Sequence, residues 1–379
     1  MLDSAQLLAE LVAVRSVNPL LSTGGPDDER QLGEHVAGLL RSWGVETELQ
    51  EVKDGRCNVI GHLPRRGAGD DAVVLLTAHM DTYPQGGPSA AYQPVRDGTM
   101  LYGRGSADAK GSLASMLAAF HRAARAPDRR ESFLAATIDE ECLLLGANAL
   151  AQHHMRPTLA VTGEPTGLVP IVAQKGIIRG SMRVRGPKAH AAYPKPRTAI
   201  TAATDLVEGV RRINADYAAT ATAGDLSAPT LTLTRIDSDG GMNLAAEEVT
   251  VWFDGRFLPG VSGEEFAAEI VGRLRTAVPA DLDFAMNELS FISPPNRCPT
   301  GNPILAEFFT AVKDVTGRCE PETFAYGSEA GVLAGFSAAS LVFGPGDARF
   351  SHGEIEGIDL TEVNAAVQIF ERLLIGGVC

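Results

Sequence analysis

Two histidines and three carboxylates stand where predicted strands end or where a predicted helix begins. The set is His79, Asp108, Glu141, Glu164 and His352. In an open α/β sheet, functional groups gather at the ends of the strands, so these side chains are expected to meet. Imidazole and carboxylate ligands without a thiolate suit zinc, cobalt or manganese, and the oxygens are too few for a calcium cage. The pattern therefore predicts two divalent ions in a hydrolytic site, where they polarise a carbonyl and acidify bound water.

Taken one at a time, the phrases that hold these residues have simpler explanations. His79 and Asp81, in TAHMDTYP, are spaced for a local hydrogen bond that needs no metal. Asp108, in LYGRGSADAKGSLASM, is a favoured residue type for capping the helix that follows, and its glycines fit neither the dinucleotide nor the P-loop spacing. The three carboxylates at 139–141 repel one another, a cost that either solvent exposure or a metal ion relieves. The metal interpretation depends on all the phrases occurring together.

Apolar spacing alternates between helical and strand periods in the first part of the chain. Helices are predicted at 4–14, 27–43, 112–125 and 146–155, and strands at 45–52, 57–63, 72–78, 132–138 and 159–163. The strand at 72–78 is apolar on both faces, which is typical of a sheet covered by helices. The end of the chain continues the pattern, with a helix at 302–316, a strand at 340–343 and a helix at 360–375. The predicted fold class is α/β with a mixed or largely parallel sheet.

The middle of the chain has a different order of elements. It alternates as strand, helix, strand, strand, helix and strand, at 171–186, 198–218, 229–237, 247–257, 262–278 and 281–291. This is the order of a ferredoxin-like βαββαβ unit. Breaks at Lys175-Gly176 and at 293–295 are the predicted hinges. The predicted organisation is one α/β domain formed by 1–176 and 294–379, interrupted by a ferredoxin-like domain at 177–293.

Composition narrows the functional class and the compartment. The 379 residues carry 33 Lys and Arg against 47 Asp and Glu, a formal net charge of −14, which argues against binding to nucleic acid or an anionic membrane. No apolar run approaches the roughly 20 residues that span a bilayer, and the first residues lack the basic region of a signal peptide. Five widely spaced cysteines without a Cys-x-x-Cys pair are typical of reduced thiols. A cytoplasmic protein that acts on a small molecule is expected.

Four phrases, in this order along the chain, carry a family resemblance. They are GRGSADAKG, IDEE, TGEPT and the segment GPGDARFSHGEIEG around His352. Together they resemble the acetylornithine deacetylase and succinyl-diaminopimelate desuccinylase family, which are dizinc amidohydrolases related to aminoacylases and some carboxypeptidases. The resemblance runs almost from end to end. It implies a zinc-peptidase-like catalytic domain with an inserted ferredoxin-like lid and dimerisation domain.

The resemblance also implies roles for the residues of the predicted site. The implied ligands are His79, Asp108 and Glu164 for one ion and Asp108, Glu141 and His352 for the other. Asp81 would orient His79, and Glu140 would take a proton from the attacking water and return it to the leaving amine. A register with Asp139 as the base and Glu140 as the ligand fits less well, because the family's Gly-Ala pair then misses Gly146-Ala147.

Residues of the inserted domain and a later segment complete the implied site. His190, in GPKAHAAYP, matches a histidine that reaches across a dimer and stabilises the tetrahedral oxyanion. Asn243 and Arg256 match residues that hold the substrate, and a planar guanidinium suits a carboxylate. The alternatives are an ordinary turn histidine and an arginine in a surface ion pair. The residues implied to line the substrate pocket are Gly327, Ser328 and Glu329, in AYGSEAGVL.

The predicted activity is metal-dependent hydrolysis of the amide bond of an N-acyl-L-amino acid. AYGSEAGVL resembles the deacetylase type, so acetylornithine-like compounds are the first substrates expected. The alternatives are a desuccinylase, dipeptidase or carboxypeptidase of the same family, or an inactive binding protein on this fold. Zn²⁺ is the expected metal, with Co²⁺ or Mn²⁺ as alternatives, and a homodimer through the inserted domain is expected. The chain departs from the family at Ala109, where Met is frequent, and at Tyr83, where many members have Val.

Overall fold

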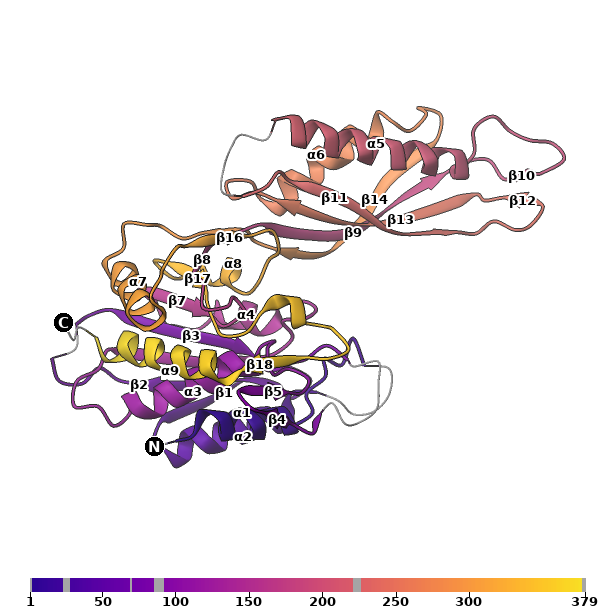
Figure 1. The fold of residues 1–379 in the computed structure, drawn as a ribbon. Helices are drawn as coiled ribbons and strands as arrows, with labels where there is room; N and C mark the ends of the chain where they lie inside the picture. The colour runs from indigo at the N-terminus through magenta and orange to yellow at the C-terminus, as the bar shows by residue number, and fades with distance from the viewer. Residues whose placement is uncertain (1, 23–27, 69, 85–91, 221–225, 377–379) are drawn as a thin grey trace. The chain divides into compact units, whose positions relative to one another are not determined.

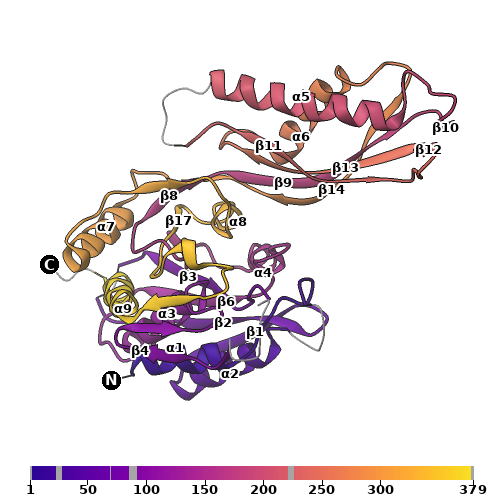
Figure 2. The same ribbon diagram turned by 45° about the vertical axis from the view of Figure 1, so that its right-hand side comes forward.

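The chain folds into two compact units (Figures 1 and 2). The computed structural model describes residues 2–22, 28–68, 70–84, 92–220 and 226–376. The first unit comprises residues 1–172, 297–322 and 328–379, and the second comprises residues 173–296 and 323–327. The chain therefore leaves the first unit twice and returns to it twice. The second excursion, at 323–327, was not predicted from the sequence.

The first unit is built on a mixed β-sheet. Its strands are β1 (Glu46–Lys53), β2 (Arg56–Leu63), β3 (Val73–His79), β6 (Glu131–Thr137), β7 (Leu159–Thr162) and β17 (Ser340–Val342), followed by β8 (Ile171–Gln174), β15 (Asn296–Arg297) and β16 (Glu322–Phe324). The strand order is β1-β2-β6-β3-β7-β17-β8-β15, and β16 pairs with β8. The central strands β6, β3, β7 and β17 are parallel, whereas β1, β2 and β8 pair antiparallel. The predicted mixed sheet is confirmed.

Helices pack on both faces of this sheet. They are α1 (Ser4–Ala13), α2 (Arg30–Ser42), α3 (Lys110–Ala123), α4 (Leu145–Leu150), α7 (Pro303–Thr316), α8 (Ala330–Leu333) and α9 (Leu360–Ile375). Val74 and Leu76 of β3 join one core with α1, α2, α3, α7 and α9. Leu75 joins a separate core with Leu150 of α4 and Leu333 of α8. Strand β3 is apolar on both faces because each face meets its own helices.

A small second sheet in the first unit was not predicted. Its strands are β4 (Val95–Asp97), β5 (Met100–Tyr102) and β18 (Gly357–Asp359), in the order β18-β5-β4. Gly357 pairs with Tyr102 in an antiparallel register. This pairing places the segment that follows His352 beside the glycine-rich segment that precedes α3.

The second unit is a ferredoxin-like domain. Its main elements are β9 (Gly176–Arg185), α5 (Ala199–Thr220), β11 (Thr230–Ser238), β13 (Glu248–Phe257), α6 (Gly263–Arg275) and β14 (Asp283–Ser293). The antiparallel sheet has the order β11-β13-β9-β14, and α5 and α6 cover one of its faces (Figure 1). Val249, Val251 and Phe253 alternate along β13 and pack under these helices. A two-stranded ribbon of β10 (Ala189–His190) and β12 (Leu244–Ala245) extends the unit.

Some predicted boundaries differ from the structure. The helix predicted at 146–155 ends at Leu150, and the strand predicted at 171–186 is divided at Lys175 because β8 and β9 belong to different sheets. The helix predicted at 27–43 is described from Arg30, and residue 27 lies outside the described residues. Gly44, with φ of 76°, follows the end of α2, where glycine favours the termination of a helix. In the described part of the chain, no helix is long and apolar enough to cross a membrane.

Candidate metal centre

The predicted ligands come from the carboxyl ends of parallel strands and from two loops. His79 is the last residue of β3, Glu141 follows β6, and Glu164 follows β7. Because these three strands are parallel neighbours, their ends lie at one edge of the sheet. Asp108 precedes α3, and His352 follows the short 3₁₀ helix η2 (Ala348–Phe350). The sheet edge therefore supplies three of the side chains, and loops supply the other two.

The first predicted ligand group is buried and closely spaced. His79, Asp108 and Glu164 each offer a ligand atom, and these atoms all lie within 4.8 Å of one another. His79 Nε2 is 2.9 Å from Asp108 Oδ1. Only 1 % of the His79 side chain is exposed. The peptide bond between Asp108 and Ala109 is cis.

The second predicted group shares Asp108 with the first. Asp108, Glu141 and His352 also place three ligand atoms within 4.8 Å of one another. His352 Nε2 is 2.9 Å from Glu141 Oε2 and 3.6 Å from Asp108 Oδ2. Asp108 thus turns one carboxylate oxygen toward each histidine. Helix α3 receives no side-chain cap, so the alternative role of Asp108 as its N-cap is not observed.

The chemistry of the group fits divalent cations. Glu164 Oε1 is buried and has no hydrogen-bond partner. Burial and the Asp108 carboxylate raise the pKa of Glu164 well above its usual range. Burial, assisted by the Glu164 carboxylate, does the same to the pKa of Glu140. Closely spaced carboxylates raise one another's pKa, and a bound divalent cation would relieve this cost.

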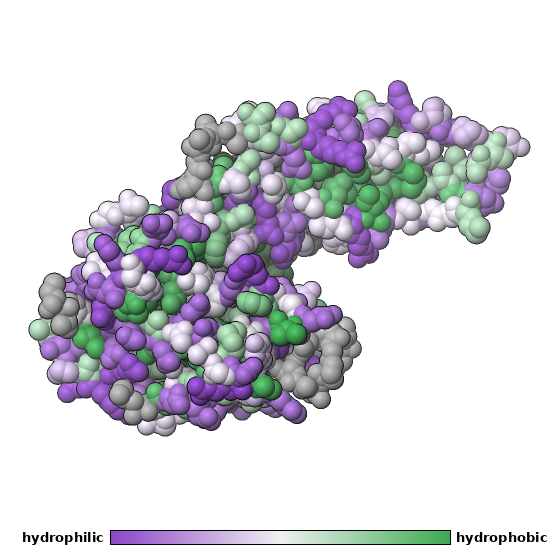
Figure 3. Space-filling view, viewed as in Figure 1, coloured by the Kyte–Doolittle hydropathy of each residue, from purple (hydrophilic) through white to green (hydrophobic). Residues whose placement is uncertain are grey.

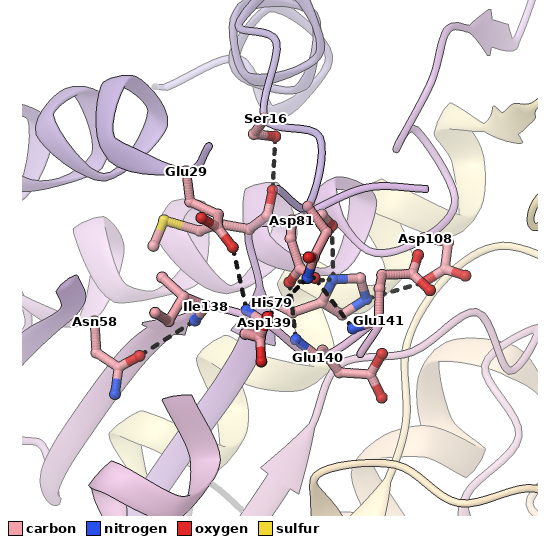
Figure 4. Close-up of polar contacts among 12 residues, drawn as sticks. Ser16, Glu29, Asn58, His79, Asp81, Asp108, Ile138, Asp139, Glu140 and Glu141 are labelled. Carbon is pink, nitrogen blue, oxygen red and sulfur yellow. Dashed lines mark hydrogen bonds and ion pairs between the residues drawn. The ribbon is translucent and has the colours of Figure 1, made fainter. Parts of the chain in front are cut away.

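Asp81 holds the main chain of the acidic run (Figure 4). Its Oδ1 accepts the Glu140 N–H at 3.0 Å, and its Oδ2 accepts the Glu141 N–H at 3.1 Å. The Nδ1 atom of His79 lies 2.9 Å from the Asp81 main-chain oxygen and 3.5 Å from Asp81 Oδ1. Asp81 therefore contacts the His79 ring mainly through its main-chain oxygen, and its carboxylate holds the peptide groups that carry Glu140 and Glu141. That Asp81 orients His79 for a metal stays a prediction.

Asp139 belongs to a buried network that the sequence did not reveal. Its Oδ1 accepts hydrogen bonds from the side chains of Asn18, at 3.0 Å, and Arg56, at 3.3 Å. Its N–H donates to Glu29 Oε1, which also pairs with Arg56. Asp139 is fully buried, with φ of 65°. This placement disfavours Asp139 as a base, and the ligand group contains Glu141 instead of Glu140.

Comparisons with known proteins identify the family of the chain. Residues 75–376 match the family model described as peptidase family M20/M25/M40. The chain belongs to this family. It is 26 % identical over 373 residues to the acetylornithine deacetylase of Aliivibrio fischeri (strain ATCC 700601 / ES114), covering 95 % of each chain. The family is described as a peptidase family and this relative is named a deacetylase, so this M20 protein is a hydrolytic enzyme.

Solved structures share the fold of this M20 enzyme. A tripeptidase from Staphylococcus aureus superposes with a TM-score of 0.77 at 18 % identity, covering 97 % of this chain and 96 % of that one. A dinuclear metal-binding peptidase of the M20 family from Bacillus subtilis gives a TM-score of 0.68 at 12 % identity, covering 98 % and 96 %. The predicted fold class, a catalytic α/β domain with an inserted domain, is confirmed.

Two predicted residues of the inserted unit are neighbours on its ribbon. His190 pairs with Leu244 across β10 and β12, and the Ala191 N–H donates to the Asn243 main-chain oxygen at 2.9 Å. Both His190 and Asn243 are exposed. A cavity of about 460 Å³ beside the ribbon is lined by His190 and by Met242. The structure therefore brings this histidine and this asparagine together on an open surface.

Arg256 lies elsewhere in the inserted unit. It stands near the end of β13 that is remote from the ribbon, roughly 26 Å away along the strand at 3.3 Å per residue. Its Nε and Nη2 donate to the two oxygens of Asp254, at 2.6 and 3.1 Å. Gly327 belongs to this region, because a Cβ on it would lie 3.2 Å from the Lys175 main-chain oxygen. Arg256 and His190 are not brought together within one unit.

Ser328 and Glu329 are both buried in the first unit. Ser328 is 3 % exposed, and Glu329 is completely buried with neither carboxylate oxygen hydrogen-bonded. Burial raises the pKa of Glu329 to about 7. That these two residues line the substrate pocket stays a prediction; helix α8, which follows them, packs against the sheet through Leu333.

Two further features of the site were missed from the sequence. Tyr83, noted only as a departure from the family, stacks on the His352 ring with 4.5 Å between ring centroids. Glu356 and Arg104 form a buried ion pair behind Asp108. The sequence offered one indication for Glu356, namely that it lies four residues after His352. Spacing alone did not show that this carboxylate faces inward.

Proposed function

We propose that this enzyme hydrolyses the amide bond of N-acyl-L-amino acids, with N-acetylornithine-like compounds as the first candidates. The observation that carries the proposal is that Asp108 joins two ligand groups while Glu140 stands beside them. The curated relatives named acetylornithine deacetylase support the substrate class. Tripeptidases and carboxypeptidases share the fold, so short peptides are the second class to be tested.

The proposed metal centre holds two divalent ions, with Zn²⁺ expected and Co²⁺ or Mn²⁺ as alternatives. The residues proposed as ligands are His79, Asp108 and Glu164 for one ion and Asp108, Glu141 and His352 for the other. When bound, such ions polarise the scissile carbonyl and lower the pKa of water. The mixture of imidazole and carboxylate ligands without cysteine suits these metals.

Glu140 is the proposed general base and acid. The structure gives its carboxylate no hydrogen bond from any described residue, so it is free to bind a water molecule. It takes a proton from the water that attacks the carbonyl carbon. As the C–N bond breaks, it returns this proton to the departing nitrogen, which leaves as an amine, and the acyl group leaves as a carboxylate. His190 is the proposed donor to the oxyanion, and Asn243 and Arg256 are the proposed substrate-binding residues.

A homodimer through the inserted domain is part of the proposal. Strand β11 is an edge strand, and edge strands are open to pairing with another chain. At Leu231, however, the Asn214 side chain already bonds the main-chain N–H and oxygen. Ile236 on this strand is 51 % exposed. On the face shown in Figure 3, hydrophobic residues gather on the inserted unit between α5 and the sheet. We expect a dimer in sedimentation velocity and its dissociation by Ile236→Lys.

The proposed compartment is the cytoplasm, because the thiol pattern is that of a reducing environment.

The test of the proposed function is hydrolysis of a small panel by metal-stripped enzyme. The panel holds N-acetylornithine, N-acetylmethionine, succinyl-diaminopimelate and a dipeptide, each with and without Zn²⁺ or Co²⁺. Metal-dependent release of an amine from an N-acyl amino acid supports the proposal. Turnover of the dipeptide alone assigns a peptidase instead. If none of the compounds is hydrolysed while two ions are bound, the proposed substrate class is contradicted. If none is hydrolysed and no ion is bound, an inactive binding protein is favoured.

A further inference from the structure

The Glu356 carboxylate accepts hydrogen bonds from main-chain amides of the loop that carries Asp108. Its side chain is buried, with 2 % exposed. Oε1 accepts the N–H groups of Ala107 and Asp108, both at 3.0 Å. Oε2 accepts the Gly105 N–H and the Arg104 Nη1 donor, both at 2.9 Å. One carboxylate therefore satisfies three backbone amides and one guanidinium.

These contacts are of the strong kind. A carboxylate that accepts from backbone amides or from arginine forms charge-assisted hydrogen bonds, which are roughly twice as strong as neutral ones. The amides of this loop are buried, so losing the acceptor would leave them unsatisfied. Because the Asp108 amide itself is held at 3.0 Å, the position of the Asp108 main chain depends directly on Glu356.

The same contacts tie the Asp108 loop to the His352 loop. Arg104 Nη2 donates to the Gly353 main-chain oxygen at 2.8 Å. The Gly103 N–H donates to the Glu356 main-chain oxygen at 3.0 Å. Pairing of β18 with β5 continues the connection. Two segments about 250 residues apart in sequence, each with one proposed ligand, are thereby joined.

The two proposed ligand groups depend on this connection to different extents. His79 belongs to the buried strand β3, and Asp81 holds its ring independently of Glu356. His352 is on a loop, with 46 % of its side chain exposed. Asp108 Oδ2 is already 3.6 Å from His352 Nε2, compared with 2.9 Å between Asp108 Oδ1 and His79 Nε2. Apart from its ligand partners, the described contact that holds the His352 ring is the stacked Tyr83 ring. The position of His352 therefore depends more on its loop than the position of His79 does.

We propose that Glu356, together with Arg104, is a positioning residue that sets the spacing between Asp108 and His352 and so makes the second ion site. The inference rests on the proposed two-metal function and goes beyond it by assigning a role to a residue pair outside the ligands. Its consequence is selective: removal of the Glu356 carboxylate weakens the ion held by Asp108, Glu141 and His352 and spares the ion held with His79.

The test is a Co²⁺ titration of the stripped full-length chain, followed by visible absorption and by competition with a chelator. For Glu356→Gln we expect the first equivalent of Co²⁺ to bind with an affinity within about threefold of the wild-type affinity. We expect the second equivalent to bind about 10–100-fold more weakly, the usual cost of losing a residue that orients metal ligands. The matched control is Glu371→Gln, which removes the carboxylate of an ion pair between α9 and Arg122 of α3 and should leave both affinities unchanged.

Each outcome has one meaning. The inference is overturned if Glu356→Gln binds both Co²⁺ ions with wild-type affinity. It is also overturned if the variant binds both ions more weakly by the same factor. Fewer than two ions in the wild type refute the proposed metal centre itself and the inference with it. If Glu356→Gln does not fold, Arg104→Lys replaces it, because a lysine retains the charge but does not reach both Glu356 and the Gly353 oxygen. Arg104→Lys should again weaken only the second ion, and an unchanged second ion overturns the inference.

Discussion

The proposed metal centre and the proposed substrate residues of the inserted unit are built in contrasting ways. Around the metal centre, His79 and Asp81 are buried and each makes defined contacts to neighbouring groups. On the ribbon of the inserted unit, His190 and Asn243 are exposed. The His190 ring accepts only the Ala192 N–H, at 3.1 Å, among the hydrogen bonds of its described surroundings.

This difference separates groups that are already held in place from exposed groups that would have to be ordered if substrate or a partner bound to them. A fixed ligand shell needs little reorganisation during the reaction, which is a major source of catalytic power. An exposed side chain loses conformational entropy when it is ordered. Changes at the metal centre should therefore remove activity outright, whereas changes in the inserted unit should reduce activity by limited factors.

Removal of the metal tests the proposed metal centre, and it should reduce the activity more than any other change. Stripping the enzyme with a chelator should abolish amide hydrolysis, and added Zn²⁺ should restore it, because the proposed reaction needs the ions to polarise the carbonyl and acidify water. His79→Ala should remain inactive after the same addition. Hydrolysis that continues after complete metal removal would contradict the proposal that a preorganised metal centre carries the reaction. Metal content is measured by mass spectrometry alongside the activity.

Glu140→Ala should have the next largest effect. General acid–base catalysis by one side chain contributes about 10²–10⁴-fold, and kcat should fall by such a factor. Metal content should stay at the wild-type value because Glu140 lies outside both ligand groups. Wild-type turnover by this variant would remove Glu140 from the mechanism.

His190→Ala should lower kcat less than Glu140→Ala does. Loss of one oxyanion donor costs about 10²–10³-fold in kcat, with little change in metal affinity. The matched control is His154→Ala, which removes another exposed histidine, one on the first unit. Equal activity of the two variants would show that the ribbon histidine is an ordinary surface residue.

Arg256→Lys should have a smaller effect, confined to substrate binding. A lysine keeps the charge but loses the planar fork that binds both oxygens of a carboxylate. We expect KM to rise by about tenfold, which corresponds to about 1.4 kcal/mol, with kcat nearly unchanged. Arg179 also contacts Asp254, at 3.0 Å, so Arg179→Lys is the matched control. If both variants leave KM unchanged, Arg256 serves only its ion pair.

Glu329 gives the smallest effect, on stability instead of activity. Its pKa is raised to about 7 by burial, so the folded protein holds this proton between about pH 4.5 and 7 while the unfolded chain releases it. The free energy of unfolding of the stripped enzyme should therefore fall as pH rises through this window, by an amount on the order of 3 kcal/mol from this group. Glu329→Gln should reduce that fall in thermal unfolding experiments. An unchanged pH dependence would contradict the assigned burial of a neutral carboxyl.

Sequence patterns predicted the elements and residues that obey local rules. Strand 72–78 was found because its apolar run reflects burial on both faces. Helix 112–125 was found from its apolar stripe, although α3 is buried along almost its whole length. The five predicted ligands were grouped because each follows a predicted strand or precedes a predicted helix, and the structure places their ligand atoms in two clusters that share Asp108. The ferredoxin-like order of the middle segment followed in the same way.

The features that were missed depend on contacts between distant segments. Arg104 meets Glu356 across about 250 residues, and Arg56 meets Asp139 across 83. No periodicity marks such pairs, because each charge is exposed or buried according to what packs against it. The burial of Glu329 was missed for the same reason. The short strands β5 and β18 are stabilised by pairing with each other, and three residues carry too little pattern to be predicted.

The most direct test of the central claim is anomalous diffraction from crystals of the enzyme grown with Zn²⁺. The account predicts two anomalous peaks per chain. One should be contacted by His79, Asp108 and Glu164, and the other by Asp108, Glu141 and His352, with Asp108 touching both. A single peak, or peaks held by other residues with this cluster empty, would contradict the account.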